Sequence, residues 1–226
     1  ARKPGKPFRI VYLTNVGGSY NMLGETLRLT REVLLEVSDF RRENCPLSAL
    51  TLGVKCGTSD ATSGIAGNPC VGAAFDQLIR AGGTAFFSET TEIIGAEDLV
   101  AKRAVNESVA KKILSAARHW EDKAKATGED IRKINPIPAN IAAGISSLEE
   151  KSLGAIAKSG TSPIQDVLKY AEMPKGSGLY FVDSWMSSLS LPLCLTACGA
   201  TIMLYQMGGG KIAQHPMMLS LIHISE

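Results

Sequence analysis

The chain has 226 residues, of which 45% are hydrophobic and 20% are charged, and its formal net charge at pH 7 is +2. This composition is typical of a globular protein with a sizeable core. Lysine and arginine are spread along the sequence without interleaved aromatic residues, which argues against a nucleic-acid partner. No apolar run approaches the roughly 18 residues that span a bilayer, and we find no signal peptide, so no membrane partner is expected.

In chain order, the first half alternates between apolar runs and helical patterns. The apolar run 8–14 predicts a buried strand, and leucines at helical spacing predict a helix over 22–37. A second strand is predicted over 49–56. Asn68 and Pro69 predict the N-cap and first residue of a helix that ends at Gly82 and Gly83. A third strand is predicted over 84–89.

The second half continues the alternation. A long helical region is predicted over 96–125, with a break near Asn106, and a proline-containing loop follows over 128–140. Ser147 and Glu150 predict a capping box at the start of the next helix. The last predicted elements are a strand over 178–183, a helix over 186–198 and a strand over 200–207.

This alternation predicts an α/β fold with a doubly wound, mostly parallel sheet and helices on both faces. Ligands of such sheets bind beyond the carboxyl ends of the strands. Polar clusters follow each predicted strand, which predicts a site there, although loops at strand ends are polar in any case. The clusters cover residues 14–19, 55–63, 88–92, 183–184 and 206–210.

The densest cluster lies within LGVKCGTSDATSGIAGNP, residues 52–69. Cys56 offers a nucleophile, Asp60 a carboxylate, and Ser59 and Ser63 hydroxyls, while N–H groups at the following helix start suit an anion. A plain turn between strand and helix explains the same residues. The segment lacks both the phosphate-binding lysine of a P-loop and the glycine fingerprint of a nicotinamide-dependent oxidoreductase, which disfavours that enzyme class.

Two further groups of charged residues are candidates for acid–base chemistry. Glu89 and Glu92 follow the third strand and could bind a metal or divide acid and base roles, or Glu92 could simply stabilise a helix start. Lys151 lies beside Glu149 and Glu150 and could be a general base, but spacing alone favours a solvated helix face.

The five cysteines are odd in number and include no C-x-x-C pair, which indicates a reduced compartment and predicts a cytoplasmic protein. Cys194 and Cys198 are four residues apart, and this spacing favours two small buried side chains over a metal-binding pair. No histidines and cysteines are spaced as in a metal site.

Three long motifs occur in order: CGTSDATSGIAGNPCVG, AGGTAFFSETTEIIGAEDL and NPIPANIAAGISSLEEKSLG. Together they resemble the C-terminal catalytic region of the altronate dehydratase and galactarate dehydratase family of sugar-acid dehydratases, and the resemblance spans residues 8–210. We therefore predict a catalytic-type α/β domain over 1–210 and an atypical tail over 211–226. The family's small, histidine-bearing N-terminal domain is missing from this sequence.

The resemblance implies loss of water from a polyhydroxy acid to give a 2-keto-3-deoxy acid, with Fe(II) as the metal. This chemistry needs a base near C2, positive charge or a metal at the enediolate, and an acid for the C3 hydroxyl. The predicted catalytic residues are Lys151, Glu89, Glu92 and Asp60. The predicted substrate-binding residues are Cys56, Ser59, Ser63, Asn68, Asn135, Asn140 and Glu150, and the metal ligands are left unassigned.

Departures from the family pattern keep two alternatives open. Ile141 stands where the family has a lysine, and Gly209 stands where it has an arginine, so two carboxylate-binding groups are lost. The chain could instead resemble the large subunit of a sulfolactate sulfo-lyase, or be a non-catalytic sugar-acid-binding or assembly module. The resemblance also predicts a homo-oligomer and an N-terminal metal-binding domain or subunit, without which the isolated chain could be inactive.

Overall fold

The computed structural model describes residues 7–208, 215 and 218–224. The chain divides into two compact units, residues 1–45 and 46–226, each considered by itself. In the first unit, α2 (Ser19–Ser38) confirms the predicted helix. The predicted strand over 8–14 is wrong, because residues 7–12 have no regular secondary structure and α1 (Leu13–Val16) follows them. The described residues of this unit contain no strand that could pair with the backbone N–H and C=O groups of that run.

The second unit contains a six-stranded parallel sheet with the order β3-β4-β2-β1-β5-β6. The doubly wound, parallel α/β prediction is thereby confirmed. Four of the strands were predicted, whereas β3 and β6 were not, and β6 lies within the segment that was predicted to be an atypical tail. The strands are β1 (Thr51–Cys56), β2 (Thr84–Phe87), β3 (Ile164–Leu168), β4 (Gly178–Val182), β5 (Ile202–Met207) and β6 (Leu219–Ile224).

Helices join the strands, and several begin where the sequence predicts. Asn106 caps α6 by accepting a hydrogen bond from Val109 N at 3.0 Å, and Ser147 caps α9 in the same way from Glu150 N at 3.2 Å. No helix in the described ranges is both long and apolar enough to cross a membrane. The helices are α3 (Asn68–Arg80), α4 (Thr90–Ile93), α5 (Glu97–Ala101), α6 (Glu107–Ala126), α7 (Ile131–Ile134), α8 (Pro138–Ala142), α9 (Leu148–Ile156) and α10 (Ser190–Cys198).

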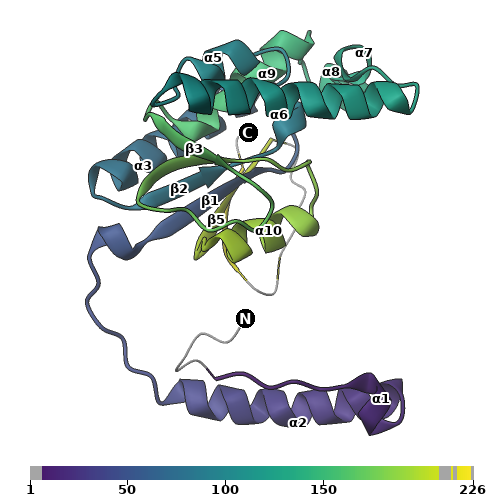
Figure 1. Cartoon of the computed structure of the whole chain (residues 1–226), viewed down its shortest axis with the longest axis vertical. Helices are drawn as coiled ribbons and strands as arrows, with labels where there is room; N and C mark the ends of the chain where they lie inside the picture. The colour runs from purple at the N-terminus through teal and green to yellow at the C-terminus, as the bar shows by residue number, and fades with distance from the viewer. Residues whose placement is uncertain (1–6, 209–214, 216–217, 225–226) are drawn as a thin grey trace. The chain divides into compact units, whose positions relative to one another are not determined.

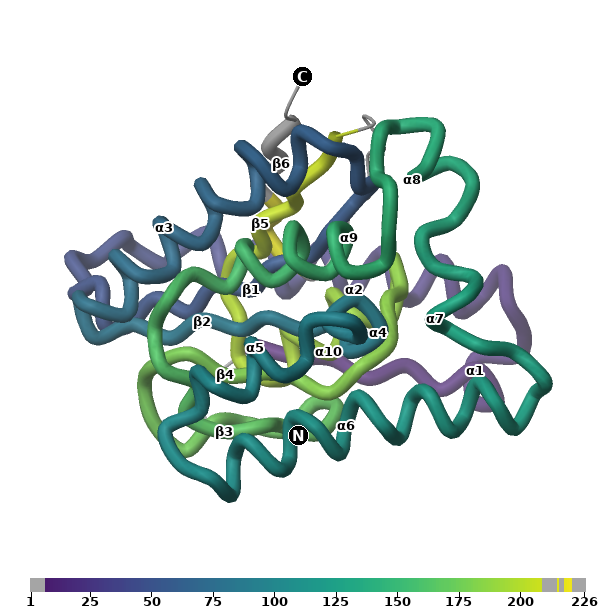
Figure 2. Tube along the Cα trace, turned by 90° about the horizontal axis from the view of Figure 1, so that it is seen from above, coloured from purple at the N-terminus to yellow at the C-terminus, as the bar shows by residue number. Residues whose placement is uncertain are grey.

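Separate cores cover the two faces of the sheet. Figure 1 shows α10 on one face and α3, α5, α6 and α9 on the other, and Figure 2 views the latter group from above. Successive strand residues point to opposite faces: Phe87 packs in the core with α3 and α6, and Phe86 packs in the core with α10. Cys194 and Cys198 are fully buried in the α10 core, as predicted.

The predicted N-cap role of Asn68 is wrong. A single π-helical turn, η2 (Ser63–Gly67), runs directly into α3, so the helical path begins before Asn68. The Asn68 side chain instead donates a hydrogen bond from Nδ2 to Gly154 O of α9 at 2.9 Å. A Cβ atom on Gly64 would lie 3.1 Å from the Cα of Gly154, so the two glycines allow η2 and α9 to cross closely.

A carboxylate on α3 fixes the loop that follows α9 and the 3-10 turn η3 (Ala157–Ser159). Asp76 accepts hydrogen bonds from the backbone N–H and hydroxyl groups of Thr161 and Ser162, at 2.6–3.0 Å. Although burial by itself raises the pKa of Asp76, these donors lower it below its usual value. The loop is therefore anchored to α3 by an ionised carboxylate.

We expect Asp76→Ala to lower the free energy of unfolding at pH 7 by about 1–3 kcal/mol, because four donor groups of Thr161 and Ser162 lose a charged acceptor. A carboxylate with a lowered folded-state pKa stabilises the fold above its unfolded pKa, and this contribution is lost as the pH falls through the folded pKa. Urea unfolding at pH 7 and pH 3 should thus show a larger loss at pH 7. Asp122→Ala, an exposed position on α6, is the control, and an equal loss in both variants would contradict the anchoring role.

Candidate functional site

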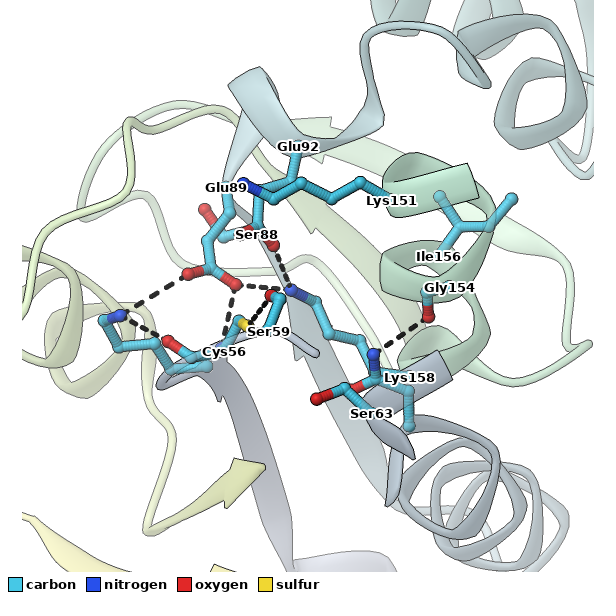
Figure 3. A network of polar contacts seen from close by, with 12 residues as sticks. Cys56, Ser59, Ser63, Ser88, Glu89, Glu92, Lys151, Gly154, Ile156 and Lys158 are labelled. Carbon is cyan, nitrogen blue, oxygen red and sulfur yellow. Dashed lines mark hydrogen bonds and ion pairs between the residues drawn. The ribbon is translucent and has the colours of Figure 1, made fainter. Parts of the chain in front are cut away.

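A buried network of charged side chains lies at the carboxyl ends of β1 and β2 (Figure 3). Lys158, from η3, donates hydrogen bonds to Glu89 Oε2 and, at 2.9 Å, to Glu92 Oε2. Lys55 of β1 approaches the other oxygen of Glu89, with Nζ 3.5 Å from Oε1, and Cys56 N donates to Glu89 Oε2 at 3.0 Å. Ammonium and carboxylate groups therefore alternate through the network, in the order Lys55, Glu89, Lys158 and Glu92.

Local backbone geometry places Glu89 in this network. The residue follows β2 and precedes α4, with φ of 72° and ψ of 61° in the left-handed region. A non-glycine residue there costs roughly 1–2 kcal/mol. The next residue, Thr90, is tied to the end of β4, because its N–H donates to Ser184 O at 2.8 Å and its hydroxyl donates to Asp183 Oδ1 at 2.8 Å. The turn thus directs the Glu89 side chain inward at an energetic cost, which is common at functional sites.

The network separates the proton affinities of the two glutamates. Burial, followed by the negative charge of Glu92, raises the pKa of Glu89 despite the opposing ammonium groups of Lys158 and Lys55. Burial also acts to raise the pKa of Glu92, but the charges of Lys158 and Lys151 outweigh it and lower that pKa. Two carboxyl groups with pKa values displaced in opposite directions can divide acid and base roles.

Lys158 itself stays protonated. Burial acts to lower its pKa, but the carboxylates of Glu89 and Glu92 raise it above the usual lysine value. The group therefore supplies fixed positive charge and is not a base. Cys56 is likewise in its protonated form, because burial, followed by the charge of Glu92, raises its pKa to about 12. Its Sγ lies 2.9 Å from Ser59 Oγ, so the thiol is a hydrogen-bonding group and not a thiolate nucleophile.

Lys151 is buried, with only 8% of its surface exposed, so the solvated-face interpretation is wrong for this residue. It is right for Glu149 and Glu150, which are exposed. The ammonium of Lys151 donates to Asn135 Oδ1 at 2.7 Å and to Asn140 Oδ1 at 3.0 Å. Amide oxygens carry no net charge, and no carboxylate of the described residues lies within 4.0 Å of this ammonium. Two neutral amide groups therefore hold its positive charge in place.

Two adjacent cavities bring the predicted site residues together. The larger, of about 510 Å³, and the smaller, of about 290 Å³, share Ser59, Asp60 and Lys151 in their walls. Of the predicted residues, Glu89 alone lines neither cavity, because it is fully buried within the charged network. The larger cavity also contains Cys56, Glu92, Asn135 and Asn140, and the smaller contains Ser63, Asn68 and Glu150.

Two of the predicted residues have local structural partners. Asp60 Oδ1 accepts hydrogen bonds from Thr62 Oγ1 at 2.7 Å and from Ser63 N at 2.9 Å, which stabilises the start of η2. Glu150 Oε2 accepts from Ser146 N at 2.6 Å at the start of α9. Catalytic or substrate-binding roles for these two residues stay predictions.

The sequence analysis missed Lys55 and Lys158. A signal for Lys55 was present, because a lysine interrupts the predicted strand over 49–56, and a charge within a buried strand needs a buried partner. Lys158 follows a helix at a position where lysine is common. Only the packing of η3 against α3 and β2 shows that its ammonium points into the sheet edge.

The site residues do not match the donor set of a metal centre. Glu89 and Glu92, the buried carboxylates of the charged network, are both paired with Lys158. Within the described ranges, no group of three or more His, Cys, Asp or Glu side chains is arranged to hold a metal ion. The described residues therefore do not fit the metal that the family resemblance implies.

Residues 47–225 match the sequence family described as D-galactarate/altronate dehydratase, C-terminal. The chain belongs to this family. The match extends through residue 225 and so includes most of the segment that was predicted to be an atypical tail.

Three relatives show the extent of the similarity. The chain is 38% identical over 193 residues to galactarate dehydratase (L-threo-forming) of Escherichia coli, covering 85% of this chain and 37% of that protein. It is 40% identical over 182 residues to altronate dehydratase of Bacillus subtilis, covering 80% and 36%. It is 34% identical over 221 residues to (2R)-sulfolactate sulfo-lyase subunit beta of Chromohalobacter salexigens, covering 96% and 56%. The chain thus spans between about a third and just over half of the length of these relatives.

We expect Lys158→Met to destabilise the fold by about 3–5 kcal/mol at pH 8, because two buried carboxylates lose their shared ammonium. Without it, burial raises the folded-state pKa of Glu89 and Glu92 above their unfolded values. Stability then falls as the pH rises through this interval, so the loss should be smaller at pH 5 than at pH 8. Urea unfolding at both pH values tests this.

Lys112→Met is the control for that measurement. It removes an exposed ion pair with Asp166 and should cost about 0–1 kcal/mol at either pH. A pH-independent loss in the Lys158 variant would show that packing, and not charge, explains the effect.

Proposed function

We propose that this chain forms the catalytic part of a hydro-lyase that dehydrates a sugar acid, such as altronate or galactarate, to a 2-keto-3-deoxy acid. Family membership and relatives named as dehydratases support the reaction class. The observation that carries the proposal is that Lys151 and Glu92 both line the larger cavity. A cation for the substrate carboxylate and a base for the adjacent carbon are the two groups that such an elimination needs first.

In this proposal Lys151 binds the substrate carboxylate. Asn135 and Asn140 hold its ammonium in position through neutral amide oxygens, so its charge can pair with an anionic ligand. As the C2 proton leaves, negative charge moves onto the carboxylate oxygens, and a fixed cation stabilises that charge more strongly than the ground state. Lys151 therefore acts on both binding and turnover.

Glu92 is the proposed proton carrier. Its pKa is lowered, so it is ionised at neutral pH and can accept the C2 proton. The same carboxyl group can then return a proton to the C3 hydroxyl, which leaves as water while the C2–C3 double bond forms. The resulting enol converts to the 2-keto form with a proton added at C3. Glu89 and Lys158 are positioning residues that fix the Glu92 side chain.

The metal, location and assembly are part of the proposal. Fe(II), which the resemblance implies, would stabilise negative charge on the substrate. We propose that its ligands lie outside the described residues, since Glu89 and Glu92 are paired with Lys158.

A relative named as a subunit supports a multi-subunit assembly. We propose a homo-oligomer and an N-terminal metal-binding domain or subunit. Free cysteines, of which Cys45 and Cys70 are exposed, support a cytoplasmic location.

We expect Lys151→Met to weaken sugar-acid binding at least tenfold and to abolish measurable 2-keto acid formation. Glu92→Gln should leave binding within a few-fold and lower turnover by about 10²–10⁴, the usual contribution of a proton-transfer group. Calorimetry measures binding, and a 2-keto acid assay with Fe(II) measures turnover. Both use this chain joined to any N-terminal partner. Full turnover in Glu92→Gln would contradict its role, and binding without turnover in the unsubstituted protein would support the binding-module alternative.

A sulfo-lyase reaction is the second candidate. The relative named (2R)-sulfolactate sulfo-lyase subunit beta covers 96% of this chain, the largest share among the three relatives. The same geometry would remove the C2 proton of sulfolactate and release sulfite from C3. Sulfite release from sulfolactate, together with no 2-keto acid from aldonates or aldarates, would select this reaction over dehydration.

A further inference from the structure

Buried hydroxyl groups tie the turn between β2 and α4 to the segment 182–184, which ends β4. Ser88 and Thr90, on either side of Glu89, have 1% and 0% of their surfaces exposed. The Ser88 hydroxyl donates a hydrogen bond to Val182 O at 2.6 Å. The Thr90 N–H donates to Ser184 O at 2.8 Å, and the Ser184 N–H donates to Thr90 Oγ1 at 3.1 Å. Both neighbours of Glu89 are therefore bonded to the same segment.

Helix α6 and the end of β3 take part in these contacts as well. The Thr90 hydroxyl donates to Asp183 Oδ1 at 2.8 Å, and Asp183 Oδ1 also accepts a hydrogen bond from Trp120 Nε1 of α6 at 2.9 Å. The Asp183 N–H donates to Leu168 O of β3 at 2.8 Å. A hydroxyl group carries a single hydrogen, so donation to Asp183 leaves the Thr90 oxygen to accept from the Ser184 N–H. Asp183 and Trp120 thus fix the direction of the Thr90 hydroxyl.

The backbone conformation at Glu89 needs such support. Its φ of 72° and ψ of 61° lie in the left-handed region, where a non-glycine residue stays only when surrounding contacts hold it. Thr90 is the first residue of α4, and the Glu92 N–H donates to Glu89 O at 2.8 Å within the same turn. A backbone change at Thr90 therefore moves both carboxylates relative to Lys158 (Figure 3).

We infer that Thr90 is a positioning residue of this site, whose contacts with the segment 182–184 hold the two glutamates against Lys158. Asp183 and Trp120 support it by directing its hydroxyl. Thr90 lines neither cavity of the site, so its effect on turnover passes through the glutamates. The inference rests on the proposed function for that effect alone, because the positions of the carboxylates can be measured without a substrate.

The test compares Thr90→Val, which removes the hydroxyl from a side chain of similar size, with Thr90→Ser, which keeps it. In a crystal structure of Thr90→Val, we expect Glu89 to leave the left-handed region and to lose its contact with Lys158. The same structure of Thr90→Ser should keep both features.

The kinetic part of the test uses the chain joined to any N-terminal partner, with Fe(II) and a sugar acid. We expect Thr90→Val to lower kcat about 10–100-fold, because the proton-transfer group is misplaced. KM should change little, since Lys151 and its amide partners are untouched. Thr90→Ser should restore kcat to near the unsubstituted value.

A second pair of variants serves if Thr90→Val does not fold. Asp183→Ala removes the acceptor of the Thr90 hydroxyl and should lower kcat, whereas Asp183→Asn keeps an Oδ1 acceptor and should restore it. Thr196→Val is the matched control, because it removes a hydroxyl that donates within α10, to Pro192 O at 2.8 Å. It should change neither the conformation of Glu89 nor kcat.

Three outcomes are decisive. An unchanged Glu89 conformation in both Thr90→Val and Asp183→Ala would overturn the inference. A displaced Glu89 with unchanged kcat would also overturn it, because the contacts would then not affect turnover. If the unsubstituted protein turns over no acid, the proposed function fails, and the crystal structures still decide whether Thr90 positions the carboxylates.

Discussion

The ammonium of Lys158 lies between two carboxylates that the fold buries at the carboxyl edge of the sheet. Glu89 and Glu92 are both excluded from water, and a buried carboxylate without a partner would either take up a proton or unfold the surrounding structure. One lysine contacts both groups, so its position decides the charge of each. The chemistry proposed for Glu92 depends on this contact, because an ionised base inside the protein requires a nearby fixed cation.

The position of Lys158 is itself secured by elements far apart in the sequence. Asp76, on α3, holds the loop after η3 through Thr161 and Ser162. The close crossing of η2 and α9 at Gly64 and Gly154 sets the height of α9 above the sheet. Each contact is a steric or hydrogen-bonding constraint on the same short segment. The site is therefore rigid where charge must be placed accurately, which is what electrostatic stabilisation of a transition state requires.

The cavity next to this network is lined by polar groups and by apolar side chains of α7 and α8. Members of one family can share a fold while they differ in the ligands that they accept. The names of the three relatives include different acids.

The sequence determined the general fold and most of the polar residues at the larger cavity. Alternating apolar runs and helical patterns predicted the parallel sheet, since strands buried on both faces need continuous apolar sequence. Polar residues at strand ends predicted the site because parallel strands all deliver their carboxyl ends to one edge. Local rules succeeded where the interaction was local, as with the capping side chain of Ser147 and the helix break near Asn106.

Tertiary structure alone decided which charges are buried and with which partners. Lys151 has the local sequence of a solvated helix face, yet packing of α9 against α4 and η2 buries it. The run 8–14 is as apolar as a strand, but the described residues of its own unit contain no strand to pair with it. Asn68 has the signature of an N-cap but lies inside a longer helical path. In each case the deciding contact joins residues distant along the chain, and local periodicity carries no information about such contacts.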